Sequence, residues 1–287
     1  MTKTWRSLLL IMALFVVSTL LLVACGQKPA QENEAETDKN AGEETPAENN
    51  LLTEIQDKGK LVVGLMGTYP PYNFLNEANE IDGYDADIAK EIAKRIGVEA
   101  EFISTEWAGM IGGLESKKFD VVISQMTITE ERKATMDFSQ PYIKNTVNII
   151  VSDDNDSIQK LEDFVGKKIG VALGTNDEAY LRDTLIPEIG EFEIVTYNDV
   201  ITTLMDLNSG RVDATINNKF ALKPLIEKND LKIKAVGEPV KSDVAGVAMR
   251  KGNPELQEAI DKALTEMKED GTLSEIHVKW FDEEPNF

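Results

Sequence analysis

The 287-residue chain is short of the side chains that most often build metal and catalytic sites: it has one cysteine, Cys25, and one histidine, His277. A single thiol cannot close an intrachain disulfide, and without a cluster of Cys and His residues the chain shows no zinc-type site. The strings G-x-S-x-G, Walker A and H-E-x-x-H are also missing. We therefore expect no catalytic residue, no metal and no cofactor.

Positive charge is also scarce, because 30 Lys and Arg stand against 51 Asp and Glu and the net charge is −21. Residues 1–24 hold two basic side chains, and residues 25–50 hold seven acids and two lysines, so the remaining 237 residues carry a net charge of −18. Such a polyanion does not favour nucleic acid or anionic lipid. After residue 24, no apolar run approaches the length of a membrane span.

The first 25 residues have the pattern of an export signal. Lys3 and Arg6 precede an apolar run at 8–23, which is short for a membrane span. The run ends in Leu-Val-Ala before Cys25, which resembles the lipobox of bacterial lipoproteins, where the Cys is lipidated and the chain is cut just before it. We predict a signal peptide at 1–24 and a lipid anchor on Cys25, palmitate included, on the outer face of the cell membrane. The alternative is a chance Cys at the end of a signal anchor.

The next segment, residues 26–50, contains no large apolar side chain and is rich in acids. It cannot bury a core, so we predict that Cys25 and these residues form a disordered acidic tether. Folding therefore falls to residues 51–287, which suffice for two modest domains or one large one.

Two stretches of the folded part repeat without gaps. Residues 59–68 match residues 166–175, and residues 114–125 match residues 207–218. Each first segment is a buried strand that runs into a Gly-Thr turn. Each second segment is a helix end, a turn and a strand that becomes polar at its tip. The repeat indicates two related lobes.

Helical patterns alternate with these strands. Asp85 is predicted to N-cap a helix that ends at Gly97. Asn253-Pro254 starts another helix, whose periodic apolar residues are Leu256, Ile260, Leu264 and Met267. Such alternation is typical of mostly parallel sheets covered on both faces, which bind ligands at the carboxyl ends of their strands. If the lobes face each other, one cleft is lined by four tips: residues 66–68, 124–127, 174–176 and 217–218.

Specific strings carry a resemblance to a known family. They are Thr-Ile-Thr-Glu-Glu-Arg at 127–132 and Asp-Phe-Ser-Gln-Pro-Tyr at 137–142, with supporting strings at 67–74, 83–85, 174–176, 270–273 and 279–281. Through them, residues 51–287 resemble the type 3 bacterial extracellular solute-binding proteins of amino-acid ABC importers. The resemblance implies an α/β fold, periplasmic-binding-protein type II-like, with two similar lobes whose mixed, mostly parallel sheets are joined by two crossing strands.

The resemblance also implies the division of the chain and its role. Lobe 1 is expected at 51–142 plus 246–287, lobe 2 at 147–241, and the hinge at 143–146 and 242–245. The expected role is that of a monomer that binds a small solute by hinge closure and delivers it to a membrane permease. The strings at 67–71, at 106–107 and after Gly174 resemble cystine-binding members in particular, which favours a polar amino acid or a cystine-like compound.

Two other classes of function stay open. One is an enzyme on the same fold, resembling cyclohexadienyl dehydratase, with Glu106 or Asp177 as the acid or base. The other is an extracytoplasmic sensor domain. The lipobox and a chain that ends with the domain favour a binding protein that is not an enzyme.

The resemblance implies which residues of this chain bind the ligand's carboxylate. Arg132 matches the arginine that binds the α-carboxylate, for which its planar fork is suited. Thr127 matches a hydroxyl donor to the same group, and Gln125 matches a backbone contact to the ligand. Thr175 and Asn176 match a turn whose N–H groups can meet an anion.

Two further roles concern the ligand's aliphatic part and its amine. Tyr69 and Trp107 match two aromatics that cover the aliphatic part, although aromatic side chains more often belong to a core. Family members usually have an aspartate at the position of Asn218, where it binds the α-ammonium, and many have an acid at the position of Met66. Here both acids are missing, and the amide of Asn218 supplies no counter-charge.

Three explanations for the missing acids remain open. In the first, another acid supplies the charge, and the nearest candidates are Asp177 and Glu178, at the start of the helix that follows residues 174–176. Alternatively, the ligand is not an ordinary free α-amino acid. The third explanation is that cleft water and the strongly negative lobes suffice.

Overall fold

The computed structural model describes residues 50–285. The predictions on the signal peptide, Cys25 and nearly all of the tether lie outside the described residues. Within residues 50–285, none of the helices combines the length and the apolar character needed to cross a bilayer. The described part starts with Asn50, whose side chain accepts a hydrogen bond from the Thr53 N–H and so caps helix α1 (Leu51–Lys58).

Eight strands form one mixed sheet in the order β5-β1-β6-β11-β7-β10-β8-β9. In lobe 1, β1 is the middle of three parallel strands, and β8 has the same place in lobe 2. These strands are β1 (Lys60–Leu65), β5 (Glu99–Ser104), β6 (Val121–Val122), β8 (Lys168–Ala172), β9 (Glu193–Tyr197) and β10 (Ala214–Asn218). The duplicated segments thus occupy equivalent places in the two lobes, which confirms the predicted α/β architecture.

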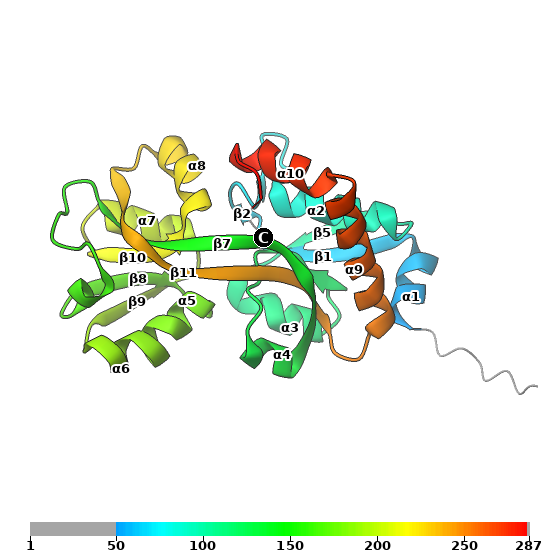
Figure 1. Cartoon of the computed structure of the whole chain (residues 1–287), viewed down its shortest axis with the longest axis horizontal. Helices are drawn as coiled ribbons and strands as arrows, with labels where there is room; N and C mark the ends of the chain where they lie inside the picture. Colours follow the sequence, from blue (N-terminus) through cyan, green and yellow to red (C-terminus); the bar gives the residue numbers. More distant parts are fainter. Residues whose placement is uncertain (1–49, 286–287) are drawn as a thin grey trace, which may run out of the picture. The chain divides into compact units, whose positions relative to one another are not determined.

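Two long strands connect the lobes, as Figure 1 shows. β7 (Met136–Ser152) and β11 (Ile233–Arg250) are 17 and 18 residues long and pair antiparallel over most of their length. On its two sides this ribbon pairs with β6 of lobe 1 and with β10 of lobe 2. The two segments predicted as the hinge, 143–146 and 242–245, lie opposite each other within it. The ribbon supplies the two crossing strands, while the lobe boundaries stay a prediction.

Lobe 1 is covered by helices with the predicted apolar spacing. On α9 (Pro254–Glu269), Leu256, Ile260 and Leu264 are fully buried, and Pro254 occupies the first turn. The other helices of this lobe after α1 are α2 (Tyr84–Arg95), η1 (Trp107–Gly109), α3 (Met110–Glu115), α4 (Glu130–Thr135) and α10 (Thr272–Phe281). A separate three-stranded sheet consists of β2 (Thr68–Tyr69), β3 (Asn73–Leu75) and β4 (Ile81–Asp82).

The start of α2 differs from the prediction. The N-cap residue is Gly83 and not Asp85, which lies in the first turn with a fully buried side chain. A Cβ atom on Gly83 would lie 2.4 Å from the carbonyl oxygen of Tyr72, so only glycine fits this close approach. Asp85 points inward because buried side-chain donors from other elements face it.

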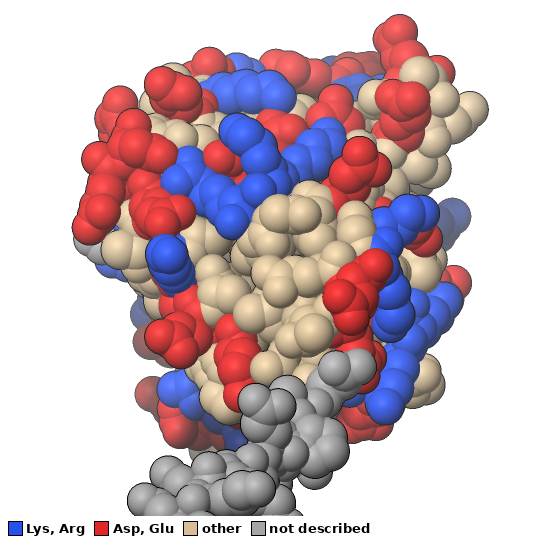
Figure 2. Space-filling model, turned by 90° about the vertical axis from the view of Figure 1, so that its right-hand side faces the viewer, with Lys and Arg blue, Asp and Glu red and all other residues tan. Residues whose placement is uncertain are grey.

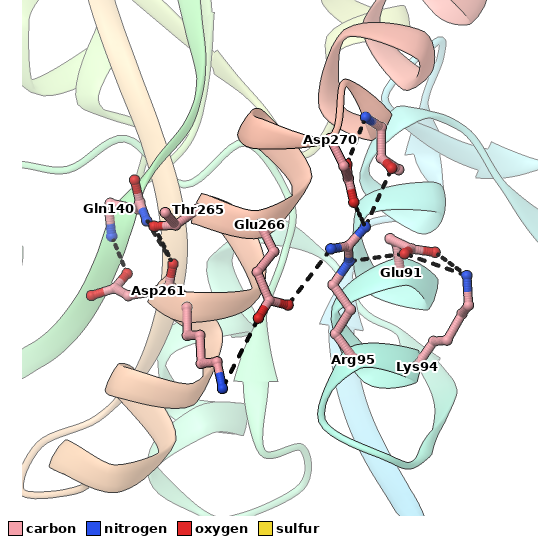
Figure 3. A network of polar contacts seen from close by, with 10 residues as sticks. Glu91, Lys94, Arg95, Gln140, Asp261, Thr265, Glu266 and Asp270 are labelled. Carbon is pink, nitrogen blue, oxygen red and sulfur yellow. Dashed lines mark hydrogen bonds and ion pairs between the residues drawn. The ribbon is translucent and has the colours of Figure 1, made fainter.

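Charged side chains join α2 to α9. Arg95 forms ion pairs with Glu91 (2.9 Å), with Glu266 of α9 (3.6 Å) and with Asp270 (2.7 Å), which follows α9. Figure 3 shows its guanidinium reaching from one helix toward the other. Figure 2 shows basic and acidic side chains intermixed around an uncharged area, on the face that lies to the right in Figure 1. Ion pairs such as those of Arg95 offset part of the negative charge of the acidic side chains.

Lobe 2 packs its own core, in which Ile169, Val171 and Ile216 of the sheet are buried. At the tip of β10, the Asn218 side chain accepts a hydrogen bond from the Phe220 N–H (3.2 Å) and caps the helix that follows. The helices of this lobe are η2 (Leu161–Phe164), α5 (Asn176–Ala179), η3 (Tyr180–Leu185), α6 (Ile186–Ile189), α7 (Val200–Asn208) and α8 (Lys219–Asn229).

Candidate functional site

A cavity of about 90 Å³ lies between the lobes, where the central strands of both end. It is lined by Met66 after β1, by Ser124 after β6, by Ala172 at the end of β8 and by Asn217 of β10. This is the position expected for a ligand site in a parallel sheet. Seven of the eight residues predicted to bind ligand line this cavity: Tyr69, Trp107, Gln125, Thr127, Thr175, Asn176 and Asn218.

Three hydrogen bonds cross from lobe 1 to lobe 2 around the cavity. The Tyr69 hydroxyl donates to Asn217 Oδ1 (2.8 Å), and the Trp107 indole N–H donates to the carbonyl oxygen of Gly174 (2.9 Å). The third bond runs from Thr127 Oγ1 to Asn176 Oδ1 (3.2 Å). Burial raises the pKa of Tyr69, with Asp177 and Asp85 adding to the rise, so its hydroxyl stays neutral and able to donate. The lobes are therefore closed over the cavity.

The eighth predicted residue, Arg132, lies beside the cavity and does not form part of its wall. Its guanidinium donates to the carbonyl oxygen of Thr127 (2.9 Å) and lies 5.5 Å from the centre of the Trp107 ring, a cation–π arrangement. It lines an outer groove of about 620 Å³ that shares Thr175, Asn176 and Asp243 with the cavity.

The environment of Arg132 leaves its charge without a direct partner in the protein. The residue is 9% exposed, and among residues 50–285 no carboxylate forms an ion pair with it. Burial lowers the pKa of its guanidinium, while the charges of Glu131, Asp177 and Asp243 oppose this shift. A guanidinium has five N–H donors, so it can donate to a carboxylate in addition to Thr127.

A charged cluster that the sequence did not reveal lies on the lobe 2 side. Asp177 and Asp243 both line the cavity, and Lys241 Nζ lies 2.8 Å from Asp177 Oδ1 and 2.9 Å from Asp243 Oδ2. The Asn176 amide also donates to Asp243 Oδ2 (2.9 Å). Asp177 is one of the two acids that the sequence suggested as partners for the ligand's amine. The sequence analysis did not identify Lys241 or Asp243. The available signal was a Lys-Ser-Asp string at the start of the predicted hinge segment.

The other acid considered for the amine, Glu178, faces away from the cavity. Its carboxylate accepts from the Gly174 N–H (2.7 Å) and pairs with Arg182 (2.8 Å), and it lines the outer groove. Glu106, considered as a catalytic group, directly precedes η1 and is not among the lining residues.

Behind the lobe 1 wall, a buried hydrogen-bond network holds Gln125. The Gln125 amide donates to Asp85 Oδ1 (2.6 Å) and accepts from Asn145 on β7 (2.8 Å). Asp85 also accepts from Asn73 (2.7 Å) and from the Tyr142 hydroxyl (2.9 Å). Burial raises the pKa of Asp85 to about 7, against the effect of these three donors. The network ties the cavity wall to the core of lobe 1 and to the ribbon between the lobes.

Within residues 50–285, no three His, Cys, Asp or Glu side chains come together as metal ligands would. The cavity wall presents hydroxyl, amide, aromatic and carboxylate groups, and the cations of Arg132 and Lys241 lie next to it. Such a site can hold a small polar solute through hydrogen bonds and charge pairing.

Comparison with known proteins agrees with this geometry. Residues 61–283 match the family described as bacterial extracellular solute-binding proteins, family 3. The L-cystine-binding protein TcyJ of Escherichia coli is 40% identical over 236 residues, which cover 82% of this chain and 87% of the relative. The L-cystine-binding protein TcyA of Bacillus subtilis is 34% identical over 277 residues, 96% of this chain and 97% of the relative.

A solved structure shows the same likeness in three dimensions. An ancestral arginine-binding protein bound to arginine superposes with a TM-score of 0.73 and is 43% identical. The match covers 78% of this chain and 98% of that chain.

Proposed function

Because the chain belongs to the bacterial extracellular solute-binding proteins of family 3, we propose that it is the extracytoplasmic substrate-binding lipoprotein of an amino-acid ABC importer. It binds one amino acid between its lobes, closes about the β7–β11 ribbon and delivers the solute to a membrane permease. It acts as a monomer that needs no cofactor. The observation that carries this proposal is the closed cavity at the strand tips, with polar groups from both lobes in its wall.

The solute is a polar amino acid or a cystine-like compound. Two relatives that match most of the chain are named for L-cystine binding. The arginine-bound neighbour makes arginine the first alternative to test. Arg132 and Thr127 are assigned to the α-carboxylate, and Tyr69 and Trp107 to the aliphatic part of the ligand. Gln125, Thr175, Asn176 and Asn218 complete the wall of the site.

The protein binds its solute without transforming it. Of the two acids considered for catalysis, Glu106 is not in the cavity wall and Asp177 is paired with Lys241. Loss of the added amino acid over hours, in place of stoichiometric binding, would contradict this part of the proposal.

A ligand screen tests the proposed function. The twenty standard L-amino acids and L-cystine are added singly to the protein in thermal denaturation, and compounds that raise the melting temperature are then titrated by calorimetry. A ligand that binds only the folded state raises the melting temperature by mass action. We expect one compound, or one chemically related group, to bind with a stoichiometry of one. Absence of binding by every compound would contradict the proposed function.

Membrane anchoring has its own test, since Cys25 lies outside the described residues. We expect Cys25→Ala to leave the signal uncut or to release the protein from the membrane, because one acyl chain anchors only marginally whereas two or three hold firmly. Detergent partitioning and the size of the product measure this. A variant that is cut normally and partitions like the wild type would refute the lipid anchor.

A further inference from the structure

The tip of β10 offers an ammonium group no charge and little free acceptor capacity. Asn217 Oδ1 accepts hydrogen bonds from the Tyr69 hydroxyl (2.8 Å) and from the Asn218 N–H (2.7 Å). Asn218 Oδ1 accepts from the Phe220 N–H at the start of α8 (3.2 Å). Both amide oxygens are therefore engaged in closing the lobes or capping a helix. An ammonium buried against them would lose its hydration without gaining a counter-charge.

Negative charge enters the cavity at one place only among the described residues. Asp177 and Asp243 are the charged side chains in its wall, and they lie together because Lys241 Nζ approaches both carboxylates within 3 Å. Two carboxylates and one ammonium leave the cluster with a net charge of −1. The cluster can therefore accept one more positive charge from the side of the cavity.

Asp177 retains acceptor capacity beyond its contact with Lys241. Its Oδ1 atom lies 2.8 Å from Lys241 Nζ, while 20% of the Asp177 side chain stays accessible. An ionised carboxylate has about four acceptor sites, so a further charged donor from the cavity can still bind it. Burial raises the pKa of Asp177, and Lys241 and Arg132 only oppose that rise. A second cation would stabilise the ionised form further.

The positions of Arg132 and of this cluster fit the two ends of one amino acid. Arg132 holds the carbonyl of Thr127, and the Thr127 hydroxyl contacts Asn176, whose amide in turn contacts Asp243. A positive group and two negative groups thus flank the same short stretch of cavity wall. In an α-amino acid the carboxylate and the ammonium are attached to one carbon, so they require opposite charges at such close range.

Building on the proposed function, we propose that Asp177 and Asp243, held together by Lys241, bind the ligand's α-ammonium group in place of the β10 tip. The site then selects solutes that carry an ammonium next to a carboxylate. Asp85 cannot take this role because it lies behind Gln125 and is saturated by three donors. Glu178 cannot take it because its carboxylate serves Arg182 and the Gly174 N–H.

A comparison of ligands with and without the amine tests this proposal. The full chain and its variants are titrated by calorimetry with two pairs of compounds: L-cystine with 3,3′-dithiodipropionate, and L-arginine with 5-guanidinopentanoate. The second member of each pair lacks only the α-amino groups. We expect wild type to bind at least one of the amino acids and to prefer it to its analogue. Asp177→Asn and Asp243→Asn should each lower the affinity for that amino acid about 30-fold or more.

The same two variants should change the affinity for the analogue less than about threefold, since it has no ammonium to lose. Asp183→Asn is the matched control, because Asp183 lines the outer groove without lining the cavity, and it should change the affinity for neither compound. Adding Asn218→Asp to Asp177→Asn should restore part of the lost affinity by returning a carboxylate to the cavity. Thermal denaturation of each variant checks that it is folded, and Asp243→Asn carries the test if Asp177→Asn does not fold.

Three outcomes would overturn the proposal. If the two Asp→Asn variants lost equal affinity for the amino acid and for its analogue, the acids would only support the fold of the site. Unchanged amino-acid affinity in both Asp→Asn variants would place the ammonium elsewhere. A wild type that binds its amino acid no better than the analogue would show that the amine is not recognised. In each of these cases the proposed binding function survives. If wild type binds neither L-cystine nor L-arginine, the amino acid found in the ligand screen and its analogue without the α-amino group replace these pairs, and binding of no amino acid at all would contradict both proposals.

Discussion

Lobe 1 and lobe 2 present different chemistry to the cavity although they share one plan of strands. Lobe 1 contributes two aromatics, hydroxyl groups and, next to the wall, the guanidinium of Arg132. Lobe 2 and the ribbon beside it contribute asparagines and the carboxylates of Asp177 and Asp243. The duplicated β6 and β10 tips thus supply equivalent positions, while the charges come from segments outside the repeat. A symmetric scaffold can hold an asymmetric solute because those additional segments differ.

Two acids, one from each lobe, show the same contrast. Asp85 of lobe 1 is surrounded by neutral donors from Asn73, Gln125 and Tyr142. Asp177 of lobe 2 is next to a lysine and faces the cavity. The first carboxylate is fully engaged by the protein and positions a wall residue, whereas the second retains capacity for a ligand.

Removing the charge of lobe 1 should have the largest effect on binding. Arg132→Ala leaves the ligand carboxylate without its partner, which costs about 2–5 kcal/mol, or roughly 30- to 5,000-fold in affinity. Arg132→Lys should retain only part of the wild-type affinity, because lysine lacks the planar fork of the guanidinium. Arg182→Ala is the matched control, since Arg182 lines the outer groove without lining the cavity. Affinity of Arg132→Ala within about threefold of wild type would refute the carboxylate role.

The buried acid of lobe 1 should make stability depend on pH. The pKa of Asp85 is about 7 in the folded protein, against 3.8 for an unperturbed aspartate, because burial disfavours the charged form. Protonation of Asp85 therefore favours the folded state, so its contribution is complete below pH of about 4 and is lost as the pH rises toward 7. The free energy of unfolding should therefore fall with rising pH across this window, on the order of 1 kcal/mol per pH unit from this group alone.

The comparison with Asp85→Asn isolates this contribution from those of other titrating groups. Urea denaturation of both proteins between pH 4 and pH 8 gives the difference in unfolding free energy at each pH. We expect the advantage of the wild type to shrink from low pH to neutral pH. A difference that stays constant across the range would contradict the assignment.

The hydrogen bonds between the lobes should have the smallest effect. Tyr69→Phe removes the donor to Asn217 and should weaken ligand binding by about 0.5–1.5 kcal/mol, roughly 2- to 13-fold, because closure loses one bond. Tyr197→Phe removes a hydroxyl that bonds Asp206 within lobe 2 (2.9 Å) and should leave ligand affinity unchanged. Equal losses in calorimetry for the two variants would show that the bond between the lobes has no special part in closure.

Local patterns predicted the fold because they report on single elements. The repeat of 59–68 in 166–175 located β1 and β8, and the periodic apolar residues of α9 all proved buried. The family strings then indicated seven residues that the structure brings into one cavity wall. Their roles stay predictions, as do the lobe boundaries.

The remaining features depend on contacts between distant segments. Asp85 was expected to cap its helix, but donors from Asn73 and Tyr142 draw it into the core. Lys241 and Asp243 reach the cavity because of the register between β7 and β11, which no local pattern specifies. Arg132 lies behind Thr127 because the short helix α4 starts just after the strand tip.

A crystal structure with a bound amino acid tests most directly the claim that the two lobes recognise opposite ends of one zwitterion. We expect carboxylate oxygens within about 3 Å of the Arg132 guanidinium and the Thr127 hydroxyl, and the ammonium within about 3 Å of Asp177 or Asp243. An ammonium that instead contacts the tip of β10, with Asp177 and Asp243 bound to Lys241 alone, would contradict it.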